Sequence, residues 1–213
     1  LDIDSTIKTI YGHQEGAEVG YNPHKRGRPS HVYHTYLVGG VRVVLDVEVQ
    51  PGKQTAAHHA LPGLWRFWET LPANARPYLV RGDCAFGQEG VLVEAETRGQ
   101  DYLFKLRLTR RPKDLIRQME REGQWQDAGQ GWQGRAGQLR LQGWSRTRRV
   151  IVLRRLLKTS PAAAPAAQQW LSWPEPFVTT APAYEYAVLV TSLKLEVLTV
   201  AQLYRDRGDA ENN

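Results

Sequence analysis

The first six residues, Leu-Asp-Ile-Asp-Ser-Thr, constrain the fold of this chain more than any other stretch. Leu1 and Ile3 alternate with Asp2 and Asp4, which is the period of a β-strand with one apolar face. Both carboxylates therefore lie on the opposite face, where like charges repel each other. Solvent at an edge strand would make this arrangement tolerable, and so would a divalent metal ion. The rest of the sequence has to decide between these two environments.

Strands and helices follow one another in the first half of the chain. Two apolar runs, 31–40 and 41–52, meet at Gly39-Gly40, which predicts an antiparallel hairpin after the opening strand. The spacing of Leu64, Trp65 and Trp68 predicts a helix within 55–71. A short strand at 77–83 ends in a carboxylate, and a helix at 87–99 and a strand at 101–108 follow. This order predicts a mixed α/β fold.

The character of the sequence changes at residue 109. Alternating patterns at 137–144 and 148–157, separated by turn residues, predict a β-rich insertion over 109–190. Residues 160–176 contain too much Pro and Ala for an assignment of secondary structure. An apolar strand at 184–193 and a closing helix from Thr199 follow. We therefore expect a core over 1–108, the insertion over 109–190, and the core resumed over 191–213.

The positive charge of the chain is concentrated in one segment. Residues 105–158 contain fifteen Lys or Arg and four Asp or Glu, a net charge of +11, whereas the remaining residues carry −5. Because Trp125, Trp132 and Trp144 interleave with these cations, we favour a nucleic-acid partner over a merely solvated basic surface. The candidate phosphate contacts in this segment are Arg146, Arg148 and Arg149.

Two further groups are candidates for DNA contact. Arg26 and Arg28 belong to an Arg-Gly-Arg-Pro segment, which either enters the minor groove as an AT-hook does or contacts phosphate as a basic loop. Tyr184 and Tyr186, at the start of the last apolar strand, are candidates for stacking on an unpaired base. Core packing is the alternative for either tyrosine.

The closing helix carries polar groups along one face. Val200, Tyr204, Arg207 and Glu211 are spaced at i, i+4, i+7 and i+11, so they share that face. A phenol, a guanidinium and a carboxylate in line suit a phosphodiester bound to metal. The alternatives are a solvated helix with a chance spacing, or Arg207 acting only as a counter-charge for nearby acids.

Three acidic motifs stand in a characteristic order. "LDIDST" on a first strand, "VRGDC" ending a later strand and "YRDRGDAE" on a late helix resemble the motifs of the DDE transposases of bacterial insertion sequences. The subgroup they resemble has a Tyr-x-x-Arg-x-x-x-Glu motif and an RNase H-like core, a mixed sheet flanked by helices, with a β-rich insertion. The resemblance implies that Asp4, Asp83 and Glu211 are catalytic and hold two Mg²⁺ ions, with Mn²⁺ as a substitute. Asp2 is then a neighbour, binding through water or solvated.

The resemblance also implies the activity and the partners. It implies cleavage of double-stranded DNA at transposon ends and strand transfer, by a homodimer on the DNA. The alternatives are an RNase H-like nuclease or resolvase that only hydrolyses, or a DNA-binding derivative without catalysis. One cysteine excludes an internal disulfide, and no apolar run reaches the ~20 residues of a membrane span. We expect no membrane partner, a bacterial cytoplasmic location at the nucleoid, and, since no Met begins the chain, a fragment of a longer protein.

Overall fold

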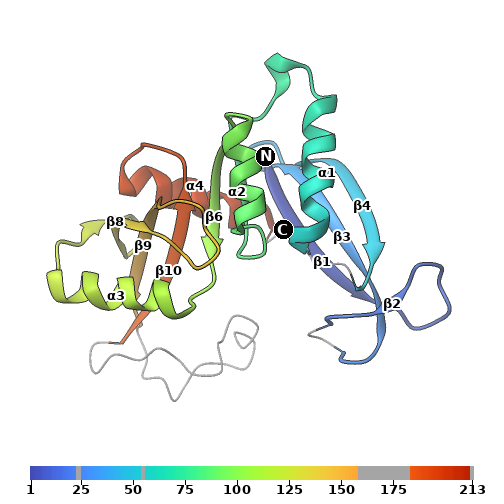
Figure 1. Ribbon diagram of the computed structural model, residues 1–213, viewed down its shortest axis with the longest axis horizontal. Helices are drawn as coiled ribbons and strands as arrows, with labels where there is room; N and C mark the ends of the chain where they lie inside the picture. Colours follow the sequence, from blue (N-terminus) through green and yellow to red (C-terminus); the bar gives the residue numbers. More distant parts are fainter. Residues whose placement is uncertain (23–24, 54–55, 158–182, 212–213) are drawn as a thin grey trace.

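One mixed sheet runs through the chain and determines where each helix lies (Figure 1). The computed structural model describes residues 1–22, 25–53, 56–157 and 183–211. Within these ranges the strands pair in the order β2-β3-β1-β5-β6-β10-β9-β8-β7, and β4 pairs with β3. The strands are β1 (Asp2–Thr9), β2 (Glu18–Val19), β3 (Pro29–Val38), β4 (Val43–Pro51), β5 (Leu79–Gly82), β6 (Asp101–Leu106), β7 (Gln126–Asp127), β8 (Trp132–Leu139), β9 (Arg148–Leu156) and β10 (Tyr184–Thr191). The helices are α1 (Ala56–Thr70), η1 (Ala73–Ala75), α2 (Glu89–Thr97), α3 (Arg110–Glu122) and α4 (Val197–Glu211).

The first strands form an antiparallel meander. β1 pairs with β3, with Asp4 opposite Thr35, and β3 turns through Gly39-Gly40 into β4, with Val38 opposite Val43. The predicted hairpin is therefore confirmed. Among the described strands, β4 pairs only with β3 and lies at the edge of the sheet on this side.

Helices α1 and α2 connect parallel strands and cover one face of the sheet. β1, β5 and β6 run parallel, and α1 and α2 lie side by side over them (Figure 1). Ile3, Leu64, Leu92 and Phe104 are buried between the sheet and these helices. This burial explains the apolar side of the Leu-Asp-Ile-Asp alternation, since Ile3 points into the core and the carboxylates point the other way.

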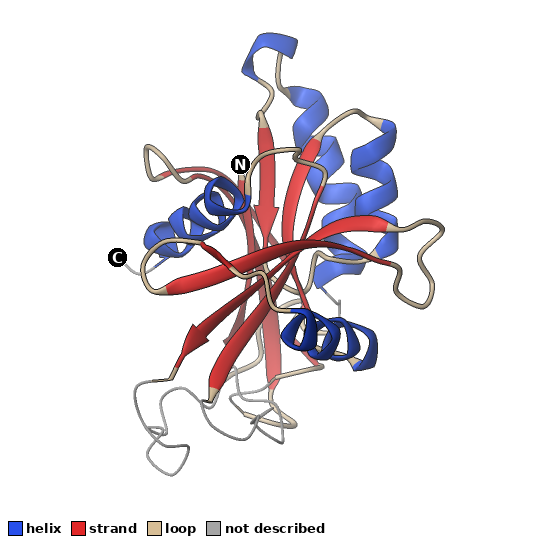
Figure 2. Cartoon of the chain, turned by 90° about the vertical axis from the view of Figure 1, so that its left-hand side faces the viewer, coloured by secondary structure: helices blue, strands red, loops and turns tan. Residues whose placement is uncertain are grey.

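Helix α4 covers the opposite face of the sheet (Figure 2). Val200 and Ala201 of α4 pack with Leu79 of β5, Leu103 of β6 and Leu189 of β10. Since side chains alternate along a strand, Leu79 and Arg81 of β5 face α4, and so do Asp2 and Asp4 of β1. The acidic face of the first strand and the last helix are thus on the same side of the sheet.

The described strands of residues 109–190, the expected insertion, extend the sheet rather than forming a separate one. β10 pairs with both β6 and β9, so hydrogen bonding continues from the core into the insertion. The prediction missed α3, because the residues from 109 onwards were expected to be β-rich. Pro112, Ile116 and Met119 are buried in α3 at helical spacing, and Gly137 of β8 leaves room for Met119.

Two helix boundaries also differ from the prediction. α4 begins at Val197, ahead of the expected Thr199, and α1 begins at Ala56, ahead of Pro62, which the sequence would favour as the start of its regular part. The Pro- and Ala-rich stretch at 160–176 lies outside the described residues. No helix in the described ranges combines the length and the apolar character that crossing a bilayer requires.

Candidate active site

The parallel pairing of β1 with β5 brings two of the expected acids together. Asp2 is opposite Arg81 and Ile3 is opposite Gly82, so the next step of this register puts Asp4 beside Asp83. Neighbouring strands lie about 4.8 Å apart, and one or two divalent cations can bridge carboxylates at such a separation. Asp4 and Asp83 are thus each the next residue after the last β1–β5 pair, Ile3 and Gly82.

A tight turn after β5 orients Asp83. The Ala85 amide donates to Asp83 Oδ1 at 2.8 Å, and the Phe86 amide donates to the Asp83 carbonyl at 3.3 Å. The preceding residue has to be glycine, because a Cβ on Gly82 would lie 2.7 Å from the Phe86 ring and 3.0 Å from Ile3. The Gly-Asp pair of the second motif therefore has a packing reason and a hydrogen-bonding reason.

Asp4 meets the guanidinium of Arg207 from α4. Arg207 Nη2 lies 3.5 Å from Asp4 Oδ1, and the hydroxyl of Thr6 donates to Asp4 Oδ2 at 3.3 Å. The Asp4 side chain is 29% exposed, whereas Arg207 is buried. The ring of Tyr204, one turn earlier on α4, lies 6.0 Å from the Arg207 guanidinium. In this structure Arg207 is a counter-charge of the first acid, and the carboxylate remains accessible.

The third expected acid, Glu211, is the last residue of α4. Its side chain lies outside what the structure describes, so its direction is not assigned. The described side chains contain no group of three His, Cys, Asp or Glu that would hold a metal ion. Asp4 and Asp83 nonetheless fit a hard divalent cation, because they offer carboxylate oxygens from adjacent strands and Asp4 is accessible.

Asp2 has neither of the environments expected for it, which were binding to metal through water and exposure to solvent. It is 1% exposed and forms a bidentate ion pair with Arg81, with Nε–Oδ1 at 2.5 Å and Nη2–Oδ2 at 2.7 Å. Arg81 Nη1 also donates to the carbonyl of Leu203 in α4. The expectation of a solvated or water-bridged Asp2 is wrong, because a buried guanidinium neutralises its charge.

The sequence contains a signal for this pair. Asp2 precedes Asp4 by two residues, and Arg81 precedes Asp83 by two. Opposite charges at the same offset on two strands that pair in parallel predict a cross-strand ion pair.

Arg148 does not suit the phosphate contact expected for it. Its side chain is 2% exposed, and it donates from Nη1 to Glu89 at 2.6 Å and from Nε to Glu96 at 2.7 Å. Burial alone would raise the pKa of Glu96, but hydrogen bonds from Arg148, Arg146 and Tyr102 outweigh it and lower that pKa to about 2. This ion-pair network joins the start of β9 to α2, so it is a structural link between insertion and core.

The other candidates in the insertion also have partners within the protein. Arg146 is half-exposed to solvent but pairs with Glu96 at 2.6 Å, and Arg149 donates to the carbonyls of Leu193 and Leu195. The Tyr186 hydroxyl donates to Glu120 at 3.0 Å, and the guanidinium of Arg154 lies 4.5 Å from the Tyr184 ring. Tyr186 also packs against the core, which is the role given as the alternative to stacking on a base, whereas Tyr184 is half-buried beside Arg154.

Much of the positive charge of the insertion is neutralised by nearby acids. The arginines within 4.0 Å of a carboxylate in this segment are Arg110, Arg117, Arg135, Arg146, Arg148, Arg154 and Arg155. The carboxylates of Glu89, Glu96 and Glu185 come from outside the segment in which the charge was counted. A net charge of +11 therefore overstates the positive surface.

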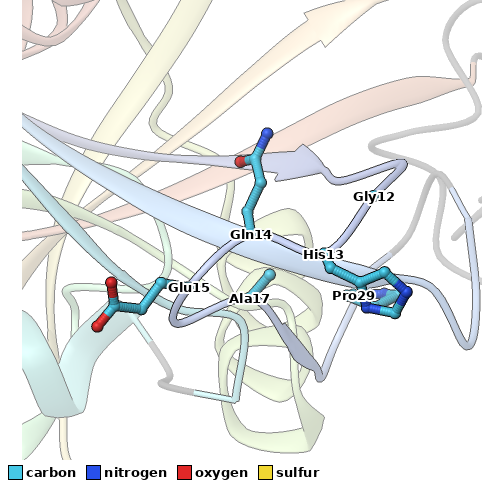
Figure 3. Close-up of a pocket in the computed structure, with 6 residues that line it drawn as sticks. All are labelled: Gly12, His13, Gln14, Glu15, Ala17 and Pro29. Carbon is cyan, nitrogen blue, oxygen red and sulfur yellow. The ribbon is translucent and has the colours of Figure 1, made fainter.

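Arg26 and Arg28 lie in an exposed loop before β3. The guanidinium of Arg28 lies 5.9 Å from the Tyr11 ring, and Lys25 lies 5.3 Å from the same ring. A shallow hollow beside this loop is lined by Gly12, His13, Gln14, Glu15, Ala17 and Pro29 (Figure 3). The loop and the hollow lie at the far end of β1, where Thr9 pairs with Ser30. Asp4 is five residues before Thr9 on this strand, so this region lies about 17 Å from Asp4. The hollow is therefore no part of the acidic site.

The sequence pattern of the family described as "Transposase DDE domain group 1" matches residues 1–213. The chain belongs to the DDE transposase family. The predicted family and the transposase domain are thereby confirmed, and DDE transposases generally use divalent metal ions. No curated protein sequence matches this DDE transposase domain significantly.

Comparison with solved structures supports the fold of this DDE transposase domain. It is similar to piggyBac transposase in a synaptic complex with hairpin DNA, with a TM-score of 0.52 and 11% identity. The similarity covers 98% of this chain and 38% of that chain, so this domain spans well under half of the piggyBac protein. The predicted RNase H-like α/β class is confirmed at the level of the mixed sheet with flanking helices.

Proposed function

We propose that this domain cleaves double-stranded DNA at transposon ends and transfers the freed 3′ ends to a new site. Asp4, Asp83 and Glu211 would hold two Mg²⁺ ions, with Mn²⁺ as a substitute. The observation that carries the proposal is the position of Asp4 beside Asp83 on the face that α4 covers, with Glu211 at the end of that helix. When bound, such ions activate the attacking oxygen and stabilise the leaving oxygen of an in-line displacement.

The side chains of α4 are proposed to bind the DNA backbone next to these acids. Arg207 reaches the Asp4 carboxylate, so a phosphate held at Asp4 lies within reach of the same guanidinium. A planar guanidinium donates two parallel hydrogen bonds to phosphate oxygens, which a point charge does not. Tyr204, one turn earlier, would donate its hydroxyl to the adjacent phosphate. Arg207 therefore exchanges a counter-charge role in the free protein for a phosphate contact in the complex.

The duplex is proposed to extend from the acids along β1 toward the exposed loop of Arg26 and Arg28. Five base pairs span about 17 Å, which matches the separation of that loop from Asp4. Arg146 is a further contact, because it is more than half exposed although it is paired with Glu96. In this proposal residues 1–108 and 191–213 are the catalytic core and 109–190 the insertion. A homodimer would hold two ends at once, at the nucleoid of a bacterial cytoplasm.

The test is single-turnover cleavage of a labelled duplex ending in the transposon sequence, measured with Mg²⁺ and with EDTA. Asp4→Ala, Asp83→Ala and Glu211→Ala should each reduce nicking by at least about 10³-fold, since each removes a ligand from the metal site. Duplex affinity should stay equal or rise, because a negative charge near phosphate is lost. Asp46→Ala is the matched control, because this exposed acid of β4 accepts a hydrogen bond from the Val47 amide and lies outside the acidic site, so the variant should cleave normally.

The products separate this proposal from a purely hydrolytic nuclease. A transposase joins the freed 3′ end to a second DNA molecule, whereas a nuclease or resolvase stops at the nick. Normal cleavage by the Asp4→Ala and Asp83→Ala variants would remove the acids from the mechanism. Duplex binding without any metal-dependent cleavage by the unaltered protein would identify a non-catalytic DNA-binding derivative.

A further inference from the structure

We propose that Asp2 and Arg81 form a positioning clamp that fixes β1, β5 and α4 relative to one another, and thereby sets the spacing of the metal-binding carboxylates. This inference rests on the proposed function of Asp4, Asp83 and Glu211. Neither Asp2 nor Arg81 contacts the reacting atoms in it, so both are positioning residues.

Arg81 uses all three of its guanidinium nitrogens within the protein. Nε and Nη2 hold both oxygens of Asp2 at 2.5 and 2.7 Å, and Nη1 donates to the carbonyl of Leu203. Asp2 is 1% exposed and Arg81 is 9% exposed. A bidentate fork fixes direction as well as distance, so the first strand, the fifth strand and the last helix are tied at one point.

The three tied residues are the near neighbours of the three acids. Asp2 is two residues before Asp4 on β1, and Arg81 is two residues before Asp83, on the same face of the sheet. Leu203 is one turn before Arg207 and two turns before Glu211 on α4. The proposed metal ligands lie only two residues or two turns from the residues of the clamp. Any displacement of the clamp therefore also displaces a proposed ligand.

Gly39 makes the clamp possible from the neighbouring hairpin turn. A Cβ at this position would lie 2.4 Å from Asp2 Oδ2 and 2.8 Å from Arg81 Nη2, whereas a Cβ at Gly40 would meet no atom within 4 Å. The backbone of the turn thus packs directly against the ion pair and excludes water from it.

A buried ion pair is poor evidence for stability alone, since an apolar pair of similar volume often replaces one without loss. This property supplies the test. The double variant Asp2→Leu/Arg81→Met keeps the site filled but removes the tie to Leu203. The matched control is Glu96→Leu/Arg148→Met, which replaces another bidentate pair, between partly buried Glu96 of α2 and buried Arg148 of β9, away from the acids.

Two quantities are measured on each folded variant. Free Mn²⁺ is followed by electron paramagnetic resonance to obtain the metal affinity, and amide hydrogen exchange is followed along α4 without metal. The clamp predicts at least a tenfold weaker Mn²⁺ affinity and at least tenfold faster exchange around Leu203 for Asp2→Leu/Arg81→Met. Duplex affinity should stay within twofold. The control pair should keep Mn²⁺ affinity and α4 exchange within twofold of the unaltered protein.

A folded Asp2→Leu/Arg81→Met variant with unaltered Mn²⁺ affinity and unaltered α4 exchange overturns the clamp. If the double variant does not fold, Arg81→Lys decides, because it keeps a positive charge beside Asp2 but cannot form all three contacts of the guanidinium. Unaltered Mn²⁺ affinity and unaltered exchange in α4 then overturn the proposal. Weaker Mn²⁺ binding together with faster exchange supports it. If the unaltered protein binds no Mn²⁺, the proposed function fails, and exchange along α4 alone decides the clamp.

Discussion

Arg207 Nη2 and Asp4 Oδ1 lie 3.5 Å apart, and they join the last helix to the first strand across 203 positions of sequence. The guanidinium is buried, and the carboxylate is accessible from solvent. In the metal-free protein this contact offsets the repulsion among acids, and a divalent cation would perform the same task.

We therefore predict that Arg207→Ala lowers the free energy of unfolding by about 1 kcal/mol in EDTA, and that millimolar Mg²⁺ restores most of the loss. Urea unfolding with and without Mg²⁺ measures both numbers. Arg205→Ala is the control on the same helix, since Arg205 bonds Gln202 rather than a site acid, and Mg²⁺ should not restore its loss. A deficit in Arg207→Ala that is independent of Mg²⁺ would contradict the exchange of roles.

Arg207→Lys tests the phosphate contact separately. The lysine keeps the positive charge beside Asp4 but lacks the planar fork, so we predict nearly unaltered stability and nicking slowed by about 10- to 100-fold. Single-turnover rates at saturating duplex give the effect. Near-normal nicking would leave Arg207 as a counter-charge only.

Gly39→Ala should destabilise the protein, because its Cβ would meet the buried Asp2–Arg81 pair at less than 3 Å. We expect a loss of about 1 to 3 kcal/mol, as for other overpacked sites. Gly40→Ala, one residue later with open space around it, should change stability by no more than about 0.5 kcal/mol. Equal effects of the two substitutions in thermal unfolding would show that the turn backbone, rather than the ion pair, controls this site.

The Glu96 network predicts a defined loss of stability in acid. The pKa of Glu96 is about 2 in the folded protein, below its ordinary value of 4.5, so the stabilisation is present above pH 4.5 and is lost as pH falls toward 2. The contribution is on the order of 3 kcal/mol or less. Between pH 5 and pH 2 the free energy of unfolding should fall less steeply for Glu96→Gln than for the unaltered protein. Parallel curves for the two proteins would assign the acid sensitivity to other carboxylates.

Replacing Arg26 and Arg28 together with Ala should reduce the salt dependence of duplex binding. If each neutralises one phosphate, the slope of log affinity against log salt should become less negative by about 1.8. Arg66→Ala is the control, because Arg66 lies on α1, across the sheet from the acids, and pairs with Glu48. An unaltered slope for Arg26→Ala/Arg28→Ala would place the DNA track elsewhere.

Local patterns predicted the parts of this fold that local physics decides. The Gly39-Gly40 turn and the alternation around Ile3 were sufficient to predict the hairpin and the buried face of β1, because both depend on neighbours in sequence. Asp4 and Asp83 were proposed as site acids from motifs, and in the structure each follows the last pair of the β1–β5 register, Ile3 and Gly82.

The features that the sequence analysis missed depend on partners far along the chain. Arg148 looked like a phosphate ligand in a basic run, but Glu89 and Glu96 lie more than fifty positions away and bury it. Asp2 looked solvated because its partner, Arg81, is 79 positions distant. A charge count along the sequence does not contain these pairings, since they arise only when strands and helices pack.

The position of β10 between β6 and β9 has a consequence for the order of folding. The helix that completes the catalytic face follows β10 directly, and β10 pairs with β6 only after a connection from Leu106 to Tyr184 has closed. Such distant pairing forms late, because the entropy of loop closure precedes the contacts that reward it. If Glu211 is the third metal ligand, as proposed, the acidic site is complete only after this late pairing has brought α4 onto the sheet.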